Sequence, residues 1–216
     1  MARKAAEGRV EGNNLISPAL VIDISRTLDE STAVYPGDIP FLRESTLSLS
    51  RGDYCNVSVL RGSAHAGTHV DLPRHLKDTE AQFPLEAFVG PAVVIEAKSW
   101  EDVVRTNIPS GQRVLFKTKN SANLSDNFDP NFECITSDVV HWLAKNEAIL
   151  VGVDGPSVDP AASELLENHH ALLEACIAIL ENLDLSAVEP GNYDLIALPL
   201  KIPSADATWV RAILLK

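Results

Sequence analysis

The segment SAHAGTHVDLPRHL, residues 63–76, gathers side chains that can bind metal ions: His65, His69, Asp71 and His75. An unpaired imidazole or carboxylate is costly to bury, because it loses its hydrogen bonds to water. These groups are also ligands that Zn²⁺ and Mn²⁺ accept, so a bound ion would offset that cost. The alternative is a solvated strand with a chance cluster of histidines. Three histidines and an aspartate in one short segment favour the metal site.

Two backbone conformations would place these four side chains together. His65 and His69 lie at i and i+4 and would share one face of a helix. The segment also contains a glycine, β-branched residues and a proline, which are poor helix formers. In an extended segment, every odd-numbered residue from 65 to 75 points to one face, and Val70 and Leu72 point towards the core. The sequence therefore predicts an extended segment with all candidate ligands on one face.

The motif H-x-G-T-H-x-D-x-P-x-H, which residues 65–75 match at every position, resembles the signature of the metal-dependent cyclase-type hydrolases. That family includes the bacterial kynurenine formamidases and relatives that open isatin or other cyclic amides. The resemblance extends over roughly residues 20–216 through the segments VIDIS, VYPGD, GVDGPSVDP, HHALLEACIAILEN, YDLIALPL and DATWVRAILL. It implies an α/β fold: a swivelling β/β/α domain of mixed sheets with a few packed helices, in a homodimer or larger homo-oligomer.

The resemblance also implies roles for individual residues. The metal ligands would be His65, His69, Asp71, His169 and Glu181, and the catalytic acid or base would be His75. The last two ligands are assigned because the family carries a histidine and a glutamate twelve residues apart, a spacing that this chain matches. The implied cofactor is a divalent metal, two Zn²⁺ per subunit or Mn²⁺ in their place.

The spacing of His169 and Glu181 sets a geometric condition. On one continuous helix, residues twelve apart are separated by about 18 Å along the axis and could not serve one site. The pattern of ELLENHHALLEA is helical, whereas the apolar residues of CIAILEN alternate like those of a strand. We therefore predict that the helix ends near Ala175 to Ile177 and that the chain then returns Glu181 to the first cluster. Adjacent helical residues cannot both face one site, so His170 is an ambiguous neighbour, and the family's spacing to Glu181 favours His169.

Two metal ions held in this way would lower the pKa of bound water and make hydroxide available near neutral pH. The hydroxide would attack an amide carbonyl, and His75 could pass a proton to the leaving amine. The resulting hypothesis is a metal-dependent amidohydrolase, an arylformamidase that converts N-formyl-L-kynurenine to kynurenine and formate in tryptophan degradation. Tyr35, in the YPGD turn, would contact the substrate ring at a position where kynurenine formamidases typically carry Trp.

Other functions stay open at this point. The same site could hydrolyse a cyclic amide such as isatin, or the chain could bind metal without catalysis, or it could be a structural domain without metal. A serine hydrolase is disfavoured because the chain lacks G-x-S-x-G. In GVDGPSVDP, Asp154, Ser157 and Asp159 could support the site or merely stabilise a turn.

The composition restricts partners and location. The chain has 18 basic and 30 acidic residues, and its formal charge of -12 disfavours nucleic acid and anionic membranes. No apolar stretch reaches the roughly 18 residues of a membrane helix, and the N-terminal sequence lacks the apolar run of a signal peptide. We therefore expect a cytoplasmic protein, and the resemblance implies that its partner is a small-molecule amide substrate. The expected organisation is a flexible extension at residues 1–18 and a single hydrolase domain at residues 19–216.

Hydrophobic patterns predict alternating strands and helices. Strands are expected at 20–25, 56–62, 91–97, 113–118 and 148–154 and in the two apolar runs near the C-terminus, and helices at 136–146 and 160–175. The strand at 56–62 alternates as a half-buried strand does. His141 lies in the first helix pattern and is interpreted as structural. Because the cysteines form no CxxC motif, we interpret Cys55, Cys134 and Cys176 as buried, reduced thiols.

Overall fold

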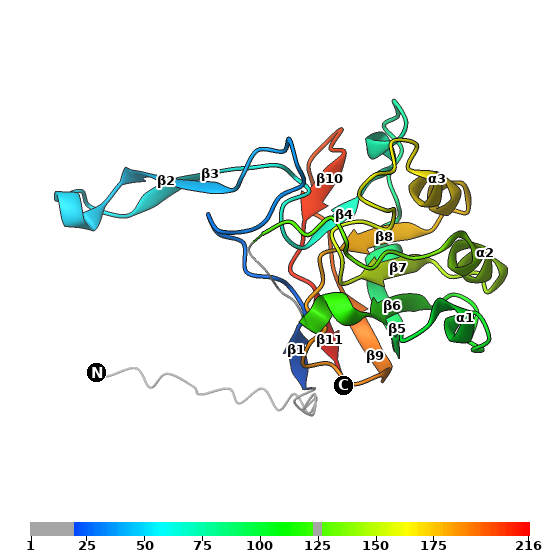
Figure 1. The fold of residues 1–216 in the computed structure, drawn as a ribbon. Helices are drawn as coiled ribbons and strands as arrows, with labels where there is room; N and C mark the ends of the chain where they lie inside the picture. The colour runs from blue at the N-terminus through cyan, green and yellow to red at the C-terminus, as the bar shows by residue number, and fades with distance from the viewer. Residues whose placement is uncertain (1–19, 123–126) are drawn as a thin grey trace, which may run out of the picture.

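The computed structural model describes residues 20–122 and 127–216, which form one nine-stranded sheet, a separate two-stranded hairpin and three α-helices (Figure 1). The strands of the main sheet are, in spatial order, β1 (Val21–Asp23), β11 (Ile213–Leu215), β9 (Gly191–Ile196), β5 (Val89–Glu96), β6 (Arg113–Lys117), β7 (Leu150–Val153), β8 (Ala178–Glu181), β4 (His69–Asp71) and β10 (Ala207–Trp209). The extension expected at residues 1–18 lies outside the described residues, so the division of the chain at residue 18 stays a prediction.

The centre of the sheet is parallel and its edges are antiparallel. Strands β5, β6, β7 and β8 run parallel to one another, and each remaining pair of neighbours is antiparallel. Parallel strands are covered on both faces, so they read as continuous apolar runs. That pattern predicted strands at 91–97, 113–118 and 148–154, and these are β5, β6 and β7.

The sheet is curled around one of its two hydrophobic cores. Val70 from β4, Leu115 from β6 and Leu214 from β11 belong to the same buried cluster, although β4 and β11 lie near opposite ends of the strand order. The curl also brings the residue after β1 to the end of β8, where Ser25 and Leu183 form an isolated antiparallel bridge. Segments from the two ends of the sheet therefore meet at the site described below.

The helices cover the other face of the sheet (Figure 1). They are α1 (Trp100–Val103), α2 (Ser137–Lys145) and α3 (Glu167–Glu174), and short 3-10 turns occur at Leu49–Arg51, Pro73–His75, Leu85–Phe88 and Lys119–Ala122. A second buried cluster joins Val114 and Val151 of the sheet to Leu143 of α2 and Leu172 of α3. Helix α2 confirms the helix predicted at 136–146. In the described part of the chain, no helix has the length and apolar character needed to cross a membrane.

Helix α3 begins later than its sequence pattern predicts. The expected helix at 160–175 is wrong over its first part, because the residues before Glu167 form turns. One turn is closed by a hydrogen bond from Ser163 N to Pro160 O of 2.9 Å. The helix starts where the carboxylate of Asp159 accepts the amide hydrogens of Asn168 and His169, at 2.9 and 3.0 Å. An acidic group at this end also suits the helix dipole.

The predicted half-buried strand at 56–62 is wrong in its burial. It forms β3 (Val57–Arg61), which pairs with β2 (Leu42–Leu47) in an antiparallel hairpin. All five residues of β3 are exposed, because the hairpin projects away from the body of the molecule (Figure 1). The alternation of apolar and polar residues predicted the strand correctly. It could not show that no other part of the described chain packs against either face of this strand.

Candidate metal centre and substrate cavity

The centre of the site is a pair of antiparallel strands. In the register of β4 and β8, His69 lies opposite Glu181 and Asp71 lies opposite Ile179. His69 and Asp71 point to one face of β4, while Val70 points to the other face and is fully buried in the core. All three residues of β4 are buried. The strand pair therefore fixes one imidazole and two carboxylates in a buried position.

The predicted extended segment from 65 to 75 is wrong outside these three residues. His65 lies in a turn before β4, and Gly67 in that turn has φ +65°, a conformation that favours glycine. After β4, Pro73 starts a 3-10 turn, Pro73–His75, which carries His75. The side chains meet because the chain bends at both ends of β4, so convergence does not come from a single strand face.

The predicted break between His169 and Glu181 is confirmed. Helix α3 ends at Glu174, Cys176 takes a left-handed conformation with φ +58°, and β8 begins at Ala178. This reversal brings the buried His169 and the buried Glu181 to the same place, with His169 Nε2 3.4 Å from Glu181 Oε1. His170 is exposed on the other side of α3 and takes no part.

The predicted metal ligands converge on one another. Nδ1 of His65 and Nε2 of His69 are 3.2 Å apart, and they lie 3.1 and 3.3 Å from Asp71 Oδ1. The other oxygen, Asp71 Oδ2, is 3.2 Å from His169 Nε2. Glu181 also lies between His69 and His169: its Oε2 is 3.4 Å from His69 Nε2, and its Oε1 faces His169. Each carboxylate thus presents one oxygen to each side of the cluster.

In His65, His69 and His169, the outer ring nitrogen, which points away from the cluster, already has a hydrogen-bond partner. His65 Nε2 is 3.0 Å from Asp206 Oδ2, His69 Nδ1 is 2.9 Å from the carbonyl oxygen of Gly67, and His169 Nδ1 is 2.6 Å from Asp159 Oδ2. In the neutral tautomers that satisfy these acceptors, each outer nitrogen donates its hydrogen outwards. The remaining nitrogen then directs a lone pair into the cluster, as in histidines that bind metal.

This donor set fits a divalent cation. Both oxygens of Asp71 are buried and form no hydrogen bond with the described residues, although a buried carboxylate without compensation is costly. In the neutral tautomers that metal binding requires, the inward nitrogens carry lone pairs and cannot donate to these oxygens. Donors at the Zn–ligand distances found in tetrahedral sites lie about 3.3 Å from one another, which matches the nitrogen–oxygen separations here. A cation between the donors would balance both the orphaned oxygens and the negative charge.

The carboxylates raise the pKa values of the neighbouring histidines. Burial lowers the pKa of His69, but the adjacent carboxylates of Asp71 and Glu181 outweigh it and raise this pKa to about 10. Burial also opposes the charge of His169, but Asp159 with Asp71 and Glu181 raise its pKa to about 12. Protons and divalent cations therefore compete for the same nitrogens, as they do in metal sites.

His75 lies beside the cluster and differs from the other histidines. Its ring centroid is 4.5 Å from that of His65 and 5.6 Å from that of His169. Its ring nitrogens form no hydrogen bond with the described residues. Burial lowers the pKa of His75, partly offset by Asp71, so its imidazole is neutral at neutral pH. A nitrogen of His75 is also close enough to His65 and Asp71 to complete a set of three ligands, so position alone allows either role.

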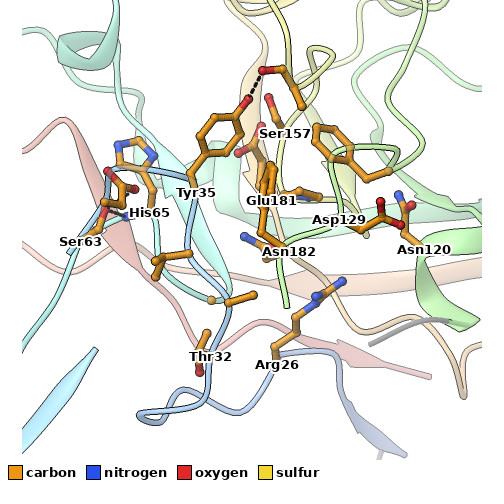
Figure 2. Close-up of a pocket in the computed structure, with 18 of the residues that line it drawn as sticks. Arg26, Thr32, Tyr35, Ser63, His65, Asn120, Asp129, Ser157, Glu181 and Asn182 are labelled. Carbon is orange, nitrogen blue, oxygen red and sulfur yellow. Dashed lines mark hydrogen bonds between the residues drawn. The ribbon is translucent and has the colours of Figure 1, made fainter. Parts of the chain in front are cut away.

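The cluster opens onto a cavity of about 1020 Å³. His65, His75, His169 and Glu181 lie at its inner end, and the aromatic side chains of Tyr35, Phe128 and Phe132 form part of its wall. Figure 2 shows Tyr35 and Arg26 on opposite sides of Glu181 and Asn182. Most of the other residues that line the cavity are polar or charged, among them Asn120 and Asp129. The cavity therefore suits a small molecule that carries both an aromatic ring and polar groups.

Tyr35, the predicted substrate contact, does line the cavity. Its hydroxyl donates to the carbonyl oxygen of Ala161 at 2.8 Å, and its ring meets that of Phe128 edge to face, with centroids 4.8 Å apart. The hydroxyl of Tyr35 is thus hydrogen-bonded to the loop before α3, and one side of its ring is in contact with Phe128. The remaining ring surface faces the cavity (Figure 2).

The sequence patterns did not reveal the role of Asp206, and the predicted burial of the cysteines is wrong. Asp206, in the loop before β10, contacts His65, although the sequence assigned it no role in the site. Asp159 contacts His169 directly, whereas Asp154 holds the loop after β6, so the members of GVDGPSVDP serve different segments. The cysteines are free but not buried: Cys55 and Cys134 are half-buried and Cys176 is exposed. His141 is exposed on α2, and its Nδ1 lies 2.8 Å from Ser137 O.

Known proteins are similar to this chain in sequence and in fold. A family model described as "Putative cyclase" matches residues 22–160. The kynurenine formamidase of Salinibacter ruber is 43% identical over 204 residues, which cover 90% of this chain and 96% of the relative. A solved structure described as a potential metal-dependent hydrolase with cyclase activity has a TM-score of 0.79 at 30% identity, covering 91% of this chain and 98% of the other. Isatin hydrolase A from Ralstonia solanacearum has a TM-score of 0.74 at 25% identity, covering 90% and 91%.

The chain therefore belongs to the cyclase family. The predicted resemblance and fold class are confirmed. The enzyme class is confirmed as well: the chain is a hydrolase, because its curated relatives are formamidases and its structural neighbours are hydrolases. The metal-dependent neighbours and the donor cluster together indicate a divalent metal.

Proposed function

We propose that this chain is a kynurenine formamidase, which hydrolyses N-formyl-L-kynurenine to kynurenine and formate. The observation that carries the proposal is a buried cluster of metal ligands that opens onto an aromatic-walled cavity. It is supported by a chain of 43% identity and nearly equal extent that bears this name. A cavity of about 1020 Å³ has room for an aromatic amide with an amino-acid side chain.

In this proposal two metal ions, Zn²⁺ or Mn²⁺, are held by five residues: His65, His69, Asp71, His169 and Glu181. Bound divalent ions of this kind polarise a carbonyl and lower the pKa of water. Asp71 and Glu181 each present one oxygen to each side of the cluster, so both would help to hold the ions. The outer contacts of the histidines hold their rings in the orientation that binding requires.

His75 acts as general acid and base. Its neutral imidazole lies next to the cluster and carries no competing hydrogen bond among the described residues, so it can accept a proton from water. It can then donate that proton to the aniline nitrogen that leaves when the formyl C–N bond breaks. Because His75 lines the cavity, the same ring reaches both water and substrate.

The aromatic ring of the substrate lies against Tyr35 and Phe128. Two aromatic side chains on one cavity wall offer apolar area at a small entropic cost. A cyclic amide such as isatin presents a similar ring, and isatin hydrolases share the fold. Formylkynurenine is preferred because the relatives with the higher identity are formamidases, and because the cavity extends well beyond a bicyclic ring.

The test is a substrate panel with the purified protein loaded with Zn²⁺ or Mn²⁺. We expect release of formate from N-formylkynurenine with a higher kcat/KM than ring opening of isatin. The reverse order would favour the cyclic-amide alternative, and turnover of neither would contradict amide hydrolysis. His69→Ala should lose metal and activity, whereas His141→Ala, a histidine replacement on the exposed face of α2, should retain both. Elemental analysis then gives the metal and its count per chain.

We also propose that the enzyme is a homodimer or larger homo-oligomer. The hairpin β2–β3 exposes apolar side chains that include Leu42, Val57, Val59 and Leu60, each between 44% and 56% exposed. An isolated two-stranded hairpin gains little stability in water by itself, and exposed apolar patches mark interaction surfaces. A cytoplasmic location remains a prediction from the sequence.

A further inference from the structure

The cavity contains two basic side chains, Arg26 and Lys119, which differ in how their charge is balanced. Lys119 Nζ is 3.0 Å from Glu133 Oε2. Arg26 forms no ion pair with the described residues, and its Nε is buried without a hydrogen-bond partner. The cavity therefore contains a guanidinium whose charge and donors are only partly satisfied by the protein.

Arg26 is held firmly at both ends. Its backbone nitrogen donates to Thr68 Oγ1 at 2.8 Å, and Thr68 Oγ1 donates to the carbonyl oxygen of Asn182 at 2.6 Å. Thr68 precedes one metal-ligand candidate, His69, and Asn182 follows another, Glu181, so the backbone of Arg26 is fixed relative to the metal centre. At the other end, Nη2 donates to the carbonyl oxygen of Asp154 at 2.6 Å. A side chain fixed in this way loses little entropy when it binds a ligand.

An anion in the cavity would complete the environment of Arg26. Burial lowers the pKa of Arg26, and the more distant carboxylates of Asp154 and Asp184 only partly offset this. The guanidinium nevertheless remains charged, because arginine does not deprotonate in proteins. Its planar fork matches a carboxylate better than any other common anionic group of small metabolites except phosphate. The acyl-aniline substrate of the proposed function carries one such group, the α-carboxylate of its amino-acid side chain.

We propose that Arg26 determines specificity by binding the α-carboxylate of an amino-acid substrate while the amide to be cleaved lies at the metal centre. This inference rests on the proposed function and names the part of the substrate that the cavity selects. Neutral ring compounds such as isatin or formanilide lack this carboxylate and gain nothing from Arg26. The substrate class is therefore an N-acylated aromatic amine that carries a carboxylate on its side chain.

The test compares N-formylkynurenine with the analogue in which hydrogen replaces the α-carboxylate, using the metal-loaded protein. For the wild-type protein, we expect kcat/KM to be roughly 10- to 100-fold higher for the carboxylate substrate, the range for a hydrogen bond to a charged group. Arg26→Met should lower kcat/KM mainly for the carboxylate substrate and bring the ratio close to one. Arg26→Lys keeps a charge but not the fork, and should give an intermediate ratio.

The matched control is Lys119→Met, which removes the other basic side chain of the cavity and should keep the wild-type ratio. Equal loss of the ratio in this control would overturn the assignment to Arg26. If Arg26→Met does not fold, the wild-type comparison and Arg26→Lys still decide, because a wild-type ratio near one contradicts carboxylate recognition. Hydrolysis of formanilide by the wild-type protein distinguishes failure of the proposed function from failure of the inference about Arg26. If formanilide is not hydrolysed, the result counts against the proposed function. If it is hydrolysed but the protein shows no preference for the carboxylate substrate, the result counts against the role of Arg26 alone.

Discussion

At the scale of single residues, the site depends on which way hydrogens and lone pairs point. Each clustered histidine directs its outer nitrogen to a protein acceptor, so the inner nitrogens can face Asp71 and Glu181. A carboxylate that is buried without donors, as Asp71 is, would otherwise destabilise the fold. The same arrangement makes metal binding dependent on residues that do not touch the metal.

His75 and the clustered histidines should respond differently to substitution. We expect His75→Ala to retain metal while turnover falls by about 10²–10⁴-fold, because the acid/base is lost and the ligand set is kept. The measurement is metal content by elemental analysis beside kcat for formate release. His169→Ala is the comparison and should lose metal. Loss of metal from His75→Ala would show instead that this residue is a ligand, a role that its distance from His65 and Asp71 permits.

Asp206 should affect the site through His65. Its carboxylate is 56% exposed and accepts from Nε2 of His65, so removing it leaves the fold intact but frees the ring to rotate or change tautomer. We expect Asp206→Ala to weaken metal affinity by roughly 10- to 100-fold, measured by competition with a chelator. Asp206→Asn retains an acceptor oxygen and should recover much of the affinity. Equal affinity in both variants and the wild type would show that Asp206 does not position His65.

At the scale of elements, loops at the ends of the central strands form the cavity wall. The carboxylate of Asp154, just after β7, is fully buried and accepts hydrogen bonds from Thr118, Asn120 and Ser121 in the loop after β6. Several donors on one carboxylate give a rigid loop. Two adjacent parallel strands therefore present their loops as one surface beside the metal centre.

This arrangement predicts a large effect for a small change. Asp154→Asn replaces one acceptor oxygen with an NH₂ group that faces existing donors, so we expect the free energy of unfolding to fall by on the order of 2–4 kcal/mol. Chemical denaturation measures this change. Asp184→Asn is the control. Among the described residues, the carboxylate of Asp184 accepts hydrogen bonds from Ser186 in an exposed turn, so the effect of this substitution should be small. Equal stability of Asp154→Asn and the wild type would show that the loop does not depend on the carboxylate.

At the scale of the whole molecule, the curled sheet and the projecting hairpin have different consequences. The curl brings the segment after β1, which carries Arg26, against the ends of β4 and β8. The hairpin β2–β3 instead points away from this body (Figure 1). The curl completes the site within the chain, whereas the hairpin leaves apolar side chains exposed.

We expect the protein to be a dimer or larger in solution and the hairpin to contribute to the interface. The double substitution Val59→Lys with Leu60→Lys should shift the protein towards monomer, because buried lysines are costly at an interface. Light scattering coupled to size exclusion measures the mass. Leu85→Lys, a replacement of another exposed leucine, is the control and should leave the mass unchanged. A monomeric wild-type protein would contradict the proposal, and an unchanged double variant would move the interface elsewhere.

Residue types and spacing alone determined the chemistry of the ligands, the central strands and the helix break before β8. These depend on local properties: imidazole and carboxylate ligand chemistry, apolar periodicity, and the reach of a helix. The tertiary structure alone decided that His65 and His75 reach the cluster from turns, that the strand at 56–62 leaves the core, and that Arg26 and Asp206 join the site. Those features depend on how distant segments pack around a curled sheet, and no local pattern encodes that packing.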